Sequence, residues 1–327
     1  MVGSGRPLLF DTGWVSDLEA MWDHDGYRGL VEQLALSNEV ICFDPPGTGL
    51  SDRDATTSSI DEEVELLRSV LEAVGVGPSR QVSMFCSSIA ASTAIRFAAL
   101  EPGLVQRMVL FGGTLRGDAL VPDDARQALL SLIRAHWGLG SKAMRDIFIP
   151  GLGSEDWKWF DSWQRQCTDG ETAALRLQMY YESDVSSEAA QVRAPTLVLH
   201  RVDDQAVRFS NGAAMAAAIA GATLEPVDGA AHLCFLGDWR QVADLTVPFF
   251  DVAPEALLPK GPYGEFTARE LDVAELTTLG LTNAAIGERL GISPRTVESH
   301  LGRIRYKLGV RTRAEVAAWM ARRTEVS

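Results

Sequence analysis

The sequence predicts an α/β domain with a mostly parallel sheet, followed by a small all-α domain. Short apolar runs alternate with helix-like segments over the first 250 residues, which is typical of a βαβα order. These runs are continuously apolar rather than alternating, as expected of parallel strands buried on both faces. Beyond residue 265 the pattern is helical only.

The strands and helices of the first domain can be placed one by one. The segment "SSIDEEVELLRSVLEAVGV" predicts a helix in which Ser59 is the N-cap and Val64, Leu67, Leu71 and Val74 share one face. The predicted strands are "RPLLF", "EVICFD", "QVSMF", "RMVLFGG", "PTLVLH" and "TLEPVDG".

Four stretches of this domain resemble the α/β-hydrolase superfamily: "FDPPGTGLSDR", "QVSMFCSSIAAS", "PTLVLHRVDDQAV" and "VDGAAHL". The resemblance implies an α/β-hydrolase fold with a Ser, Asp, His order of catalytic residues. The two glycines of "GTG" fit a tight turn. The rest of a dinucleotide fingerprint is absent, so no nucleotide cofactor is expected.

The turn "MFCSSIAAS" holds two candidate nucleophiles, Ser87 and Ser88. A sharp strand-to-helix turn needs small residues two positions before and two after the strained one, because backbone and neighbouring strand approach closely. With Ser88 at the centre these residues are Cys86 and Ala90, whereas Ser87 would place Phe85 and Ile89 there. Sterics therefore favour Ser88.

The resemblance supplies the partners of Ser88. Its register indicates Asp204 rather than Asp203 as the acid, and of the five histidines only His232 stands at the expected place, directly after the last predicted strand of the first domain. The oxyanion hole is expected from the backbone N–H groups of Ile89 and Trp14. In "LLFDTGW" the carboxylate of Asp11 would oppose an oxyanion if it pointed inward; pointing to solvent or pairing elsewhere is the alternative.

Residues 114–190 interrupt the alternation of strands and helices and are rich in aromatic residues, which predicts a helical lid. Most of these rings are expected to fill the core of the lid itself. A lid also covers a pocket, which we expect to be largely apolar. The predicted pocket residues are Trp14, Trp157, Trp159, Trp163, Tyr180 and Tyr181.

The domain boundaries follow from composition and charge. Residues 253–265 carry prolines and glycines and predict a linker between a domain of residues 1–252 and one of residues 266–327. Residues 260–327 hold 11 Lys and Arg against 8 Asp and Glu, a net charge of +3, whereas the preceding 259 residues carry −17. Only the C-terminal part is therefore expected to meet a polyanion.

The C-terminal segment predicts consecutive short helices with clear caps. Thr267 and Glu270 form a capping-box pattern, and Thr282 caps a second helix that Gly291 ends. A third helix begins with Ser293 as N-cap and Pro294 at the first helical position, and a fourth is expected near residues 312–321. The third helix carries the apolar residues Val297, Leu301, Ile304 and Leu308 on one face and polar residues on the other. This is a helix-turn-helix plan.

The stretches "FTARE", "GLTNAAIGERLGISPRTVESHL" and "KLGVRTRAE" resemble the DNA-binding domain of LuxR-type transcription regulators. The resemblance implies that the third helix enters the major groove of double-stranded DNA and that the fourth pairs two subunits as a homodimer. Glu298 and Ser299 would then face bases. By the same resemblance Thr296, Arg303, Lys307 and Arg311 would lie near phosphates, and Arg295 is a further expected DNA contact.

Three functions fit these patterns. The first is a transcription regulator whose hydrolase-like domain senses a small, largely apolar, ester- or lactone-like molecule and slowly hydrolyses it. The second, compatible with the first, is an active serine esterase or lactonase attached to a DNA-binding domain. The third is an inactive domain that only dimerises the DNA-binding parts.

The sequence also makes several functions unexpected. The four cysteines are far apart and form no metal-like pair, so neither a metal nor a cofactor is expected. The sequence has no run of about 18 apolar residues, so no membrane span is expected. The segment "MVGSGRP" lacks the apolar stretch of a signal peptide. The expected location is the cytoplasm.

Overall fold

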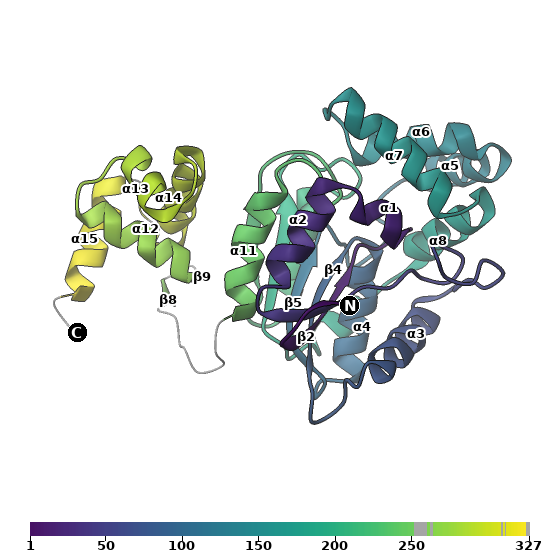
Figure 1. The fold of residues 1–327 in the computed structure, drawn as a ribbon, viewed down its shortest axis with the longest axis horizontal. Coiled ribbons are helices and arrows are strands. Elements are labelled where there is room, and N and C mark those ends of the chain that lie inside the picture. Colours follow the sequence, from purple (N-terminus) through teal and green to yellow (C-terminus); the bar gives the residue numbers. More distant parts are fainter. Residues whose placement is uncertain (252–259, 262–263, 309, 311, 325–327) are drawn as a thin grey trace. The chain divides into compact units, whose positions relative to one another are not determined.

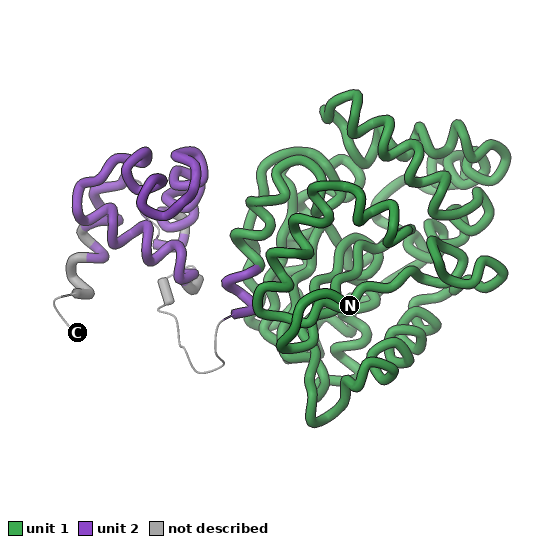
Figure 2. Tube along the Cα trace, in the orientation of Figure 1, with its two compact units in different colours: residues 1–246 green, residues 247–327 purple. Residues whose placement is uncertain are grey.

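The structure, a computed structural model, describes residues 1–251, 260–261, 264–308, 310 and 312–324. The chain divides into two compact units, residues 1–246 and 247–327 (Figure 2). The first unit is an α/β fold and the second is mainly helical, so the predicted fold class is confirmed. No helix among the described residues is long and apolar enough to cross a membrane.

The first unit is built on a seven-stranded sheet within the described residues, in the order β1-β3-β2-β4-β5-β6-β7 (Figure 1). All neighbouring strands pair in parallel except β1, a two-residue edge strand that the sequence did not predict. The strands are β1 Val2–Gly3, β2 Arg6–Asp11, β3 Asn38–Ile41, β4 Val82–Ser87, β5 Val105–Phe111, β6 Thr196–Arg201 and β7 Thr223–Val227.

Helices cover both faces of this sheet, so the strands are buried and can be continuously apolar. On one face α3 and α4 form a large apolar cluster with β4 and β5. On the other face lies α2, where Gly29 makes room for the ring of Trp239; a Cβ at Gly29 would lie 2.5 Å from it. The helices are α1 Leu18–Trp22, α2 Asp25–Leu34, α3 Ile60–Ala73, α4 Ile89–Leu100, α10 Phe209–Ala218 and α11 Trp239–Asp251.

Five further helices lie between β5 and β6, in the segment expected to form a lid (Figure 1). They are α5 Asp123–Ala135, α6 Trp137–Phe148, α7 Ser154–Cys167, α8 Gly170–Glu182 and α9 Ser186–Ala189. Helix α5 packs against both α6 and α8, and α6 packs against α7. Helices α5 to α8 form the layer above the carboxyl ends of the strands, where the candidate site lies, whereas α9 packs against α4 and α10.

The second unit has its own apolar core, formed by residues such as Phe266, Val273, Ile286 and Leu301. Its elements are β8 Lys260–Gly261, β9 Gly264–Glu265, α12 Ala268–Thr278, α13 Asn283–Leu290, α14 Pro294–Leu308 and α15 Arg313–Thr324. The predicted linker, 253–265, falls largely outside the described residues.

The predicted caps of the second unit are present. The Thr267 hydroxyl accepts from the Glu270 N–H while the Glu270 carboxylate accepts from the Thr267 N–H, a complete capping box. Gly291 ends α13 in the left-handed conformation, with φ of 68°. The Ser293 hydroxyl then accepts from the Thr296 N–H at 3.0 Å, which fixes the start of α14.

Candidate functional site

Ser88 occupies the turn between β4 and α4. Its φ of 55° and ψ of −125° make it the one non-glycine residue with positive φ in the part of the chain that the structure describes. Such a conformation costs on the order of 1–3 kcal/mol and persists only where the surroundings enforce it. Here the Ser88 N–H donates to the Phe111 carbonyl of β5 at 2.9 Å.

Ser88, His232 and Asp204 form a continuous hydrogen-bonded chain. The Ser88 hydroxyl Oγ lies 2.9 Å from His232 Nε2, and His232 Nδ1 lies 2.8 Å from Asp204 Oδ2. All three residues are buried. This is the geometry in which an imidazole accepts the proton of a serine hydroxyl while a carboxylate orients the ring.

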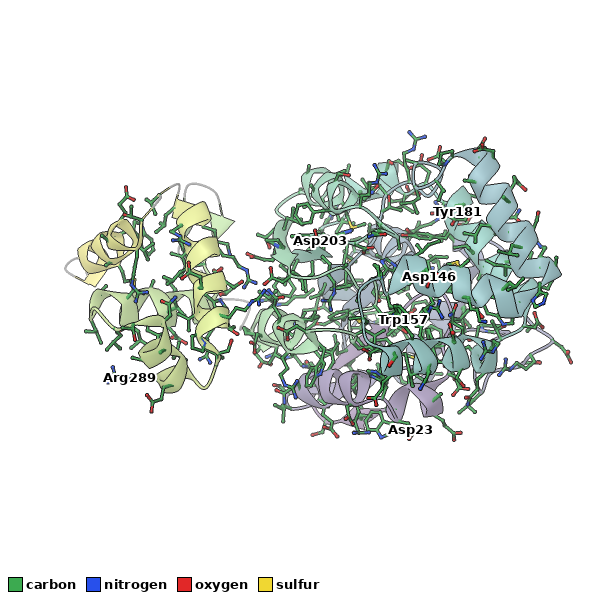
Figure 3. The ribbon with its side chains drawn as sticks, turned by 90° about the horizontal axis from the view of Figure 1, so that it is seen from above. Asp23, Asp146, Trp157, Tyr181, Asp203 and Arg289 are labelled. Atoms are coloured by element: carbon green, nitrogen blue, oxygen red, sulfur yellow. The ribbon has the colours of Figure 1, made fainter. Side chains whose placement is uncertain are left out.

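The loop after β6 holds Asp204 as the buried acid. Asp204 Oδ1 accepts from the N–H groups of Ala206 and Val207 at 2.9 and 3.1 Å, which leaves Oδ2 for His232. Burial opposes ionisation of Asp204, yet the His232 ring and these amides outweigh it, so its pKa falls below the ordinary value. Asp203, the rejected alternative, is exposed (Figure 3).

The loop that carries His232 is held from two sides. The guanidinium of buried Arg201, at the end of β6, donates to the carbonyls of Asp228 and Leu236. From the lid, the Phe148 carbonyl accepts from the His232 N–H at 2.6 Å, and the two rings lie 5.0 Å apart. Sequence reasoning missed both Arg201 and Phe148 as site residues.

The loop after β2 lies directly against Ser88. A Cβ on Gly13, which has φ of 99°, would lie 2.6 Å from the Ser87 carbonyl and 3.2 Å from Ser88 Cβ, so only glycine fits. Within the described residues, neither the Trp14 N–H nor the Ile89 N–H donates to a protein acceptor. Both amides therefore remain able to bind a ligand oxygen beside Ser88, as an oxyanion hole requires.

Asp11 is paired within this same loop. Its Oδ1 accepts from the Gly13 N–H at 2.9 Å, which corresponds to the predicted alternative in which the carboxylate pairs elsewhere. Burial raises the pKa of Asp11 to about 7, and the nearby Glu63 carboxylate acts in the same direction. The group therefore changes charge near neutral pH.

Trp14 is also held by lid helix α8. Its carbonyl accepts from Arg176 Nε at 2.6 Å, and its indole N–H donates to the Ala173 carbonyl at 2.9 Å. Arg176 is only 1% exposed and forms an ion pair with Glu63 of α3, N to O 2.9 Å. Nothing in the local sequence singled out Arg176.

The lid aromatics form a chain of ring contacts that reaches the candidate site through Phe148. Ring centroids are 5.5 Å apart for Trp14 and Phe148, 6.3 Å for Phe148 and Phe160, and 5.3 Å for Phe160 and Trp163. Trp159 stacks on Trp163 at 5.3 Å. Two of the predicted pocket residues, Trp14 and Trp163, are buried in this chain of rings. Trp159 continues it to His24 and Phe235.

Trp157 does not line an interior pocket, contrary to the sequence prediction. Its side chain is 39% exposed, and the Arg145 guanidinium lies 5.0 Å from the ring centroid. Helical spacing alone would place Trp157 on the same side as Phe160, three residues later, but Trp157 lies in the first turn of α7, where its ring packs against Arg145 rather than inside the lid.

Tyr180 and Tyr181 point in different directions from α8. Tyr180 packs with Ile89, Met179 and Val207, and its hydroxyl is close enough to Ser88 for that residue to affect its pKa. Burial nevertheless raises the pKa of Tyr180 strongly, so the phenol stays protonated. No hydrogen-bond partner for this hydroxyl lies in good geometry within the described residues. Tyr181 is also buried, and burial raises the pKa of its phenol to about 12, while the nearby Arg126 charge acts in the opposite direction.

In the second unit, α14 presents four of the predicted DNA-binding residues at its surface. Arg295 and Glu298 are exposed, and Thr296 and Ser299 are half-buried. Glu298 accepts from Asn283 Nδ2 at 2.7 Å and from Arg305 at 2.9 Å, so its carboxylate is already oriented. Arg305 was not among the predicted DNA-binding residues.

Two predicted phosphate contacts are buried instead. Lys307 is 6% exposed, and its Nζ lies 3.0 Å from a Glu270 carboxylate oxygen on α12. Arg303 is 7% exposed on the same side of α14. Helix α12 packs against this side of α14, so these cations do not face solvent in this structure. Arg311 lies outside the described residues.

No group of three or more His, Cys, Asp or Glu side chains placed to hold a metal ion occurs among the residues that the structure describes. The histidine nearest the triad, His200, lies 3.8 Å from Asp204 Oδ2 and contacts the Val207 carbonyl at 2.7 Å. Burial lowers the pKa of His200, so it is a neutral structural neighbour of the acid.

Comparison with known proteins finds a match for each unit. Residues 8–245 match the alpha/beta hydrolase family, and residues 265–320 match the bacterial regulatory proteins of the luxR family. The hydrolase part is 24% identical over 236 residues to an Azorhizobium caulinodans protein provisionally named a carbamate hydrolase. That match covers 70% of this chain and 85% of the relative.

The second unit has a relative of its own. It is 42% identical over 65 residues to a Mycobacterium bovis protein provisionally named an HTH-type transcriptional regulator, with 20% of this chain and 7% of the relative covered. Among solved structures, a hydrolase from Oleispira antarctica superposes with a TM-score of 0.70 at 18% identity. The superposition covers 77% of this chain and 93% of the Oleispira chain, and it shows that the two share a fold.

Proposed function

Because the chain belongs to the alpha/beta hydrolase family and ends in a luxR-family regulatory domain, we propose that it is a ligand-responsive transcription regulator. Its hydrolase domain binds a small, largely apolar ester or lactone and hydrolyses it slowly. The observation that carries this proposal is the Ser88–His232–Asp204 chain on a strained turn, in the same polypeptide as a helix-turn-helix domain.

The reaction follows from the geometry of the site. Ser88 Oγ attacks the substrate carbonyl carbon while His232 Nε2 takes the hydroxyl proton, and Asp204 stabilises the imidazolium. The N–H groups of Trp14 and Ile89 hold the oxyanion. The intermediate then collapses, the bond to the alcohol oxygen breaks, and His232 returns the proton to that oxygen. Water hydrolyses the Ser88 ester by the same steps in the second half.

The aromatic residues of the lid indicate the class of ligand. Phe148 lies against His232, and behind it the rings of Phe160, Trp163 and Trp159 form an apolar cluster. Such a lining favours apolar ligands with few oxygen atoms. Tyr180, whose hydroxyl remains protonated beside Ser88, supplies a hydrogen-bond donor to one of those oxygens.

For DNA recognition we propose the exposed face of α14. Arg295 and Thr296 lie at its N-terminal end, where they would contact phosphates, and Glu298 and Ser299 would face bases. A homodimer would place two such helices on neighbouring half-sites. The linker of residues 253–265 would separate the two functions.

Hydrolysis is tested with short-chain aryl esters and a fluorophosphonate probe. We expect Ser88-dependent turnover and covalent labelling of Ser88, both lost in Ser88→Ala. The matched control is Ser87→Ala, which removes the neighbouring hydroxyl and should keep both. Equal labelling of Ser88→Ala and wild type would show that another residue reacts.

Sensing is tested by DNA binding. A ligand alters DNA affinity only if it binds the two states of the protein unequally. We expect an ester that Ser88→Ala binds but cannot cleave to change the Kd for a promoter fragment by about 5-fold or more, in the range typical of coupled sites. Arg295→Ala should weaken DNA binding without affecting ester hydrolysis.

The second candidate function is a serine esterase or lactonase with an attached DNA-binding domain and no coupling between them. The complete hydrogen-bonded chain at Ser88 favours this alternative. Turnover together with a DNA affinity that no ligand alters would identify it. Absence of both turnover and labelling, with a ligand that alters DNA affinity, would leave a receptor alone.

A further inference from the structure

The lid and the oxyanion loop are joined through one residue, Trp14. Helix α8 of the lid holds it twice, because Arg176 Nε donates to its carbonyl and the Ala173 carbonyl accepts from its indole N–H. These contacts connect residues more than 150 positions apart in the sequence. They flank the backbone N–H that the proposed hydrolysis uses as an oxyanion donor.

Arg176 is itself fixed by a second set of contacts. Its Nη1 donates to the Thr57 hydroxyl and to Glu63 Oε1, each at 2.9 Å, and the Thr57 hydroxyl also hydrogen-bonds that carboxylate oxygen. The guanidinium is planar, so a bond at Nη1 determines where Nε points. Arg176 is therefore held rigidly, and it fixes the orientation of the Trp14 carbonyl.

The neighbouring loop residues leave little other support for the Trp14 peptide. Gly13 has φ of 99° and no side chain, and its N–H is taken by Asp11. A glycine at this position gives the chain freedom that must be restricted from elsewhere if the next amide is to point at one spot. The Trp14 ring also packs against Phe148 and Trp137 of the lid, and the two hydrogen bonds from α8 fix its carbonyl and its indole N–H.

We propose that Arg176 is a positioning residue for hydrolysis: by holding the Trp14 carbonyl it fixes residue Trp14, so that the N–H of the preceding Gly13–Trp14 peptide points at the oxyanion, and it thereby makes transition-state stabilisation depend on the lid being in place. The inference rests on the proposed hydrolytic function. Arg176 does not touch substrate; it acts through Trp14. A small misplacement of an oxyanion donor is enough to slow such a reaction strongly.

The test is Arg176→Lys, which keeps the positive charge beside buried Glu63. A lysine has one ammonium group and cannot reproduce the two-sided fork that binds Trp14 and Glu63 together. The matched control is Arg134→Lys on α5, where the arginine contacts Glu171 and Gln178 at the surface of the lid.

Two measurements separate positioning from a purely structural role. The first is the split between kcat and KM for an aryl ester. The second is the affinity of a trifluoromethyl ketone, which binds as a mimic of the tetrahedral intermediate. On binding, Ser88 Oγ bonds to the carbonyl carbon of the ketone, and the Ser88 proton moves to His232. The electron pair of the C=O bond then forms an oxyanion beside Trp14.

We expect Arg176→Lys to lower kcat by about 10- to 100-fold and to weaken the ketone by a similar factor, with KM within about twofold of wild type. Arg134→Lys should leave all three values unchanged. A variant that loses thermal stability but keeps wild-type kcat and ketone affinity would overturn the proposal. A rise in KM with kcat unchanged would also overturn it.

Hydrogen exchange of residues 12–16 provides a readout that needs no turnover. Faster exchange in Arg176→Lys than in wild type and Arg134→Lys supports the proposal that Arg176 restrains this loop. Unchanged exchange contradicts it. If wild type itself shows neither turnover nor labelling, hydrolysis fails as the proposed function. The exchange result still decides whether Arg176 holds the loop.

Discussion

Asp11 is the residue with the least expected chemistry in the site. A carboxylate beside the proposed oxyanion loop would oppose the charge that develops in the proposed reaction, yet this one pairs with the Gly13 N–H and has its pKa raised to about 7. Below that pH it is neutral and harmless to the transition state. Above it, the negative charge acts on the same loop that should stabilise an oxyanion.

Asp11→Asn is predicted to remove a pH dependence of stability. The folded-state pKa lies above the ordinary value of 3.8, so the folded protein binds the proton more tightly. The free energy of unfolding therefore falls as pH rises from about 4 to about 7 and is flat above. Near pH 8 the variant should be more stable by on the order of 2 kcal/mol, measured by urea unfolding.

The same variant should hydrolyse aryl esters faster than wild type above pH 7 and about equally below it. Asp203→Asn, which changes an exposed carboxylate near the site, is the control and should alter neither profile. Identical pH profiles for Asp11→Asn and wild type would mean that the Asp11 charge does not reach the reaction.

Tyr180→Phe is predicted to slow turnover without destabilising the fold. The hydroxyl is buried and lacks a partner in good geometry within the described residues, so its removal should stabilise the protein by up to about 1 kcal/mol. If it donates to bound substrate, kcat/KM should fall by about 10-fold. The control is Tyr181→Phe, on a different face of α8, which should leave kcat/KM at its wild-type value. Loss of stability with unchanged turnover in Tyr180→Phe would contradict the proposal that the Tyr180 hydroxyl donates to substrate.

The triad was predictable because its determinants are local. Small neighbours select Ser88, and Asp204 and His232 each follow a strand whose apolar run is plain in the sequence. Arg176 and Phe148 were not predictable in this way, because their roles arise only when the lid folds back over strands that are distant in the sequence.

At the scale of elements, α14 shows why helical patterning misassigned two cations. The apolar residues Val297, Leu301 and Ile304 mark one buried face, and the polar residues were assigned to the opposite, exposed face. In the structure α12 also packs against α14, and Lys307 reaches Glu270 across that contact. A helix buried on two sides has a narrower exposed face than a single apolar stripe indicates.

Lys307→Met is therefore predicted to destabilise the second unit rather than to remove a phosphate contact. It leaves the Glu270 carboxylate buried without its ammonium partner, at a cost of about 3 kcal/mol in unfolding free energy. Adding Glu270→Gln should restore part of that loss. Arg295→Ala should do the opposite, with stability within about 0.5 kcal/mol of wild type and weaker DNA binding. A stable Lys307→Met protein that binds DNA weakly would restore the original interpretation.

At the scale of the whole molecule, charge is divided between the units. Residues 260–327 carry +3 and the rest of the chain −17, so the larger part repels DNA while the smaller part binds it. The second unit also has its own apolar core within the described residues, which favours independent folding.

A fragment of residues 260–327 is predicted to fold and to bind DNA more tightly than the full chain at low salt. Removing 259 residues with a net charge of −17 removes long-range repulsion, so the difference should shrink as salt screens it. Fluorescence anisotropy across a salt series measures this, with circular dichroism as the check on folding. A difference that persists at high salt would indicate a specific contribution of the first unit.

The strained turn at residue 88 has a consequence for how this sequence is maintained. Glycine adopts a φ of 55° freely, so Ser88→Gly should relieve backbone strain, and a receptor that only held its ligand would tolerate that change and fold better for it. Substitutions that relieve this backbone strain would tend to accumulate if the serine hydroxyl had no function. If Ser88 performs the proposed hydrolysis, stability and chemistry select in opposite directions at this one position.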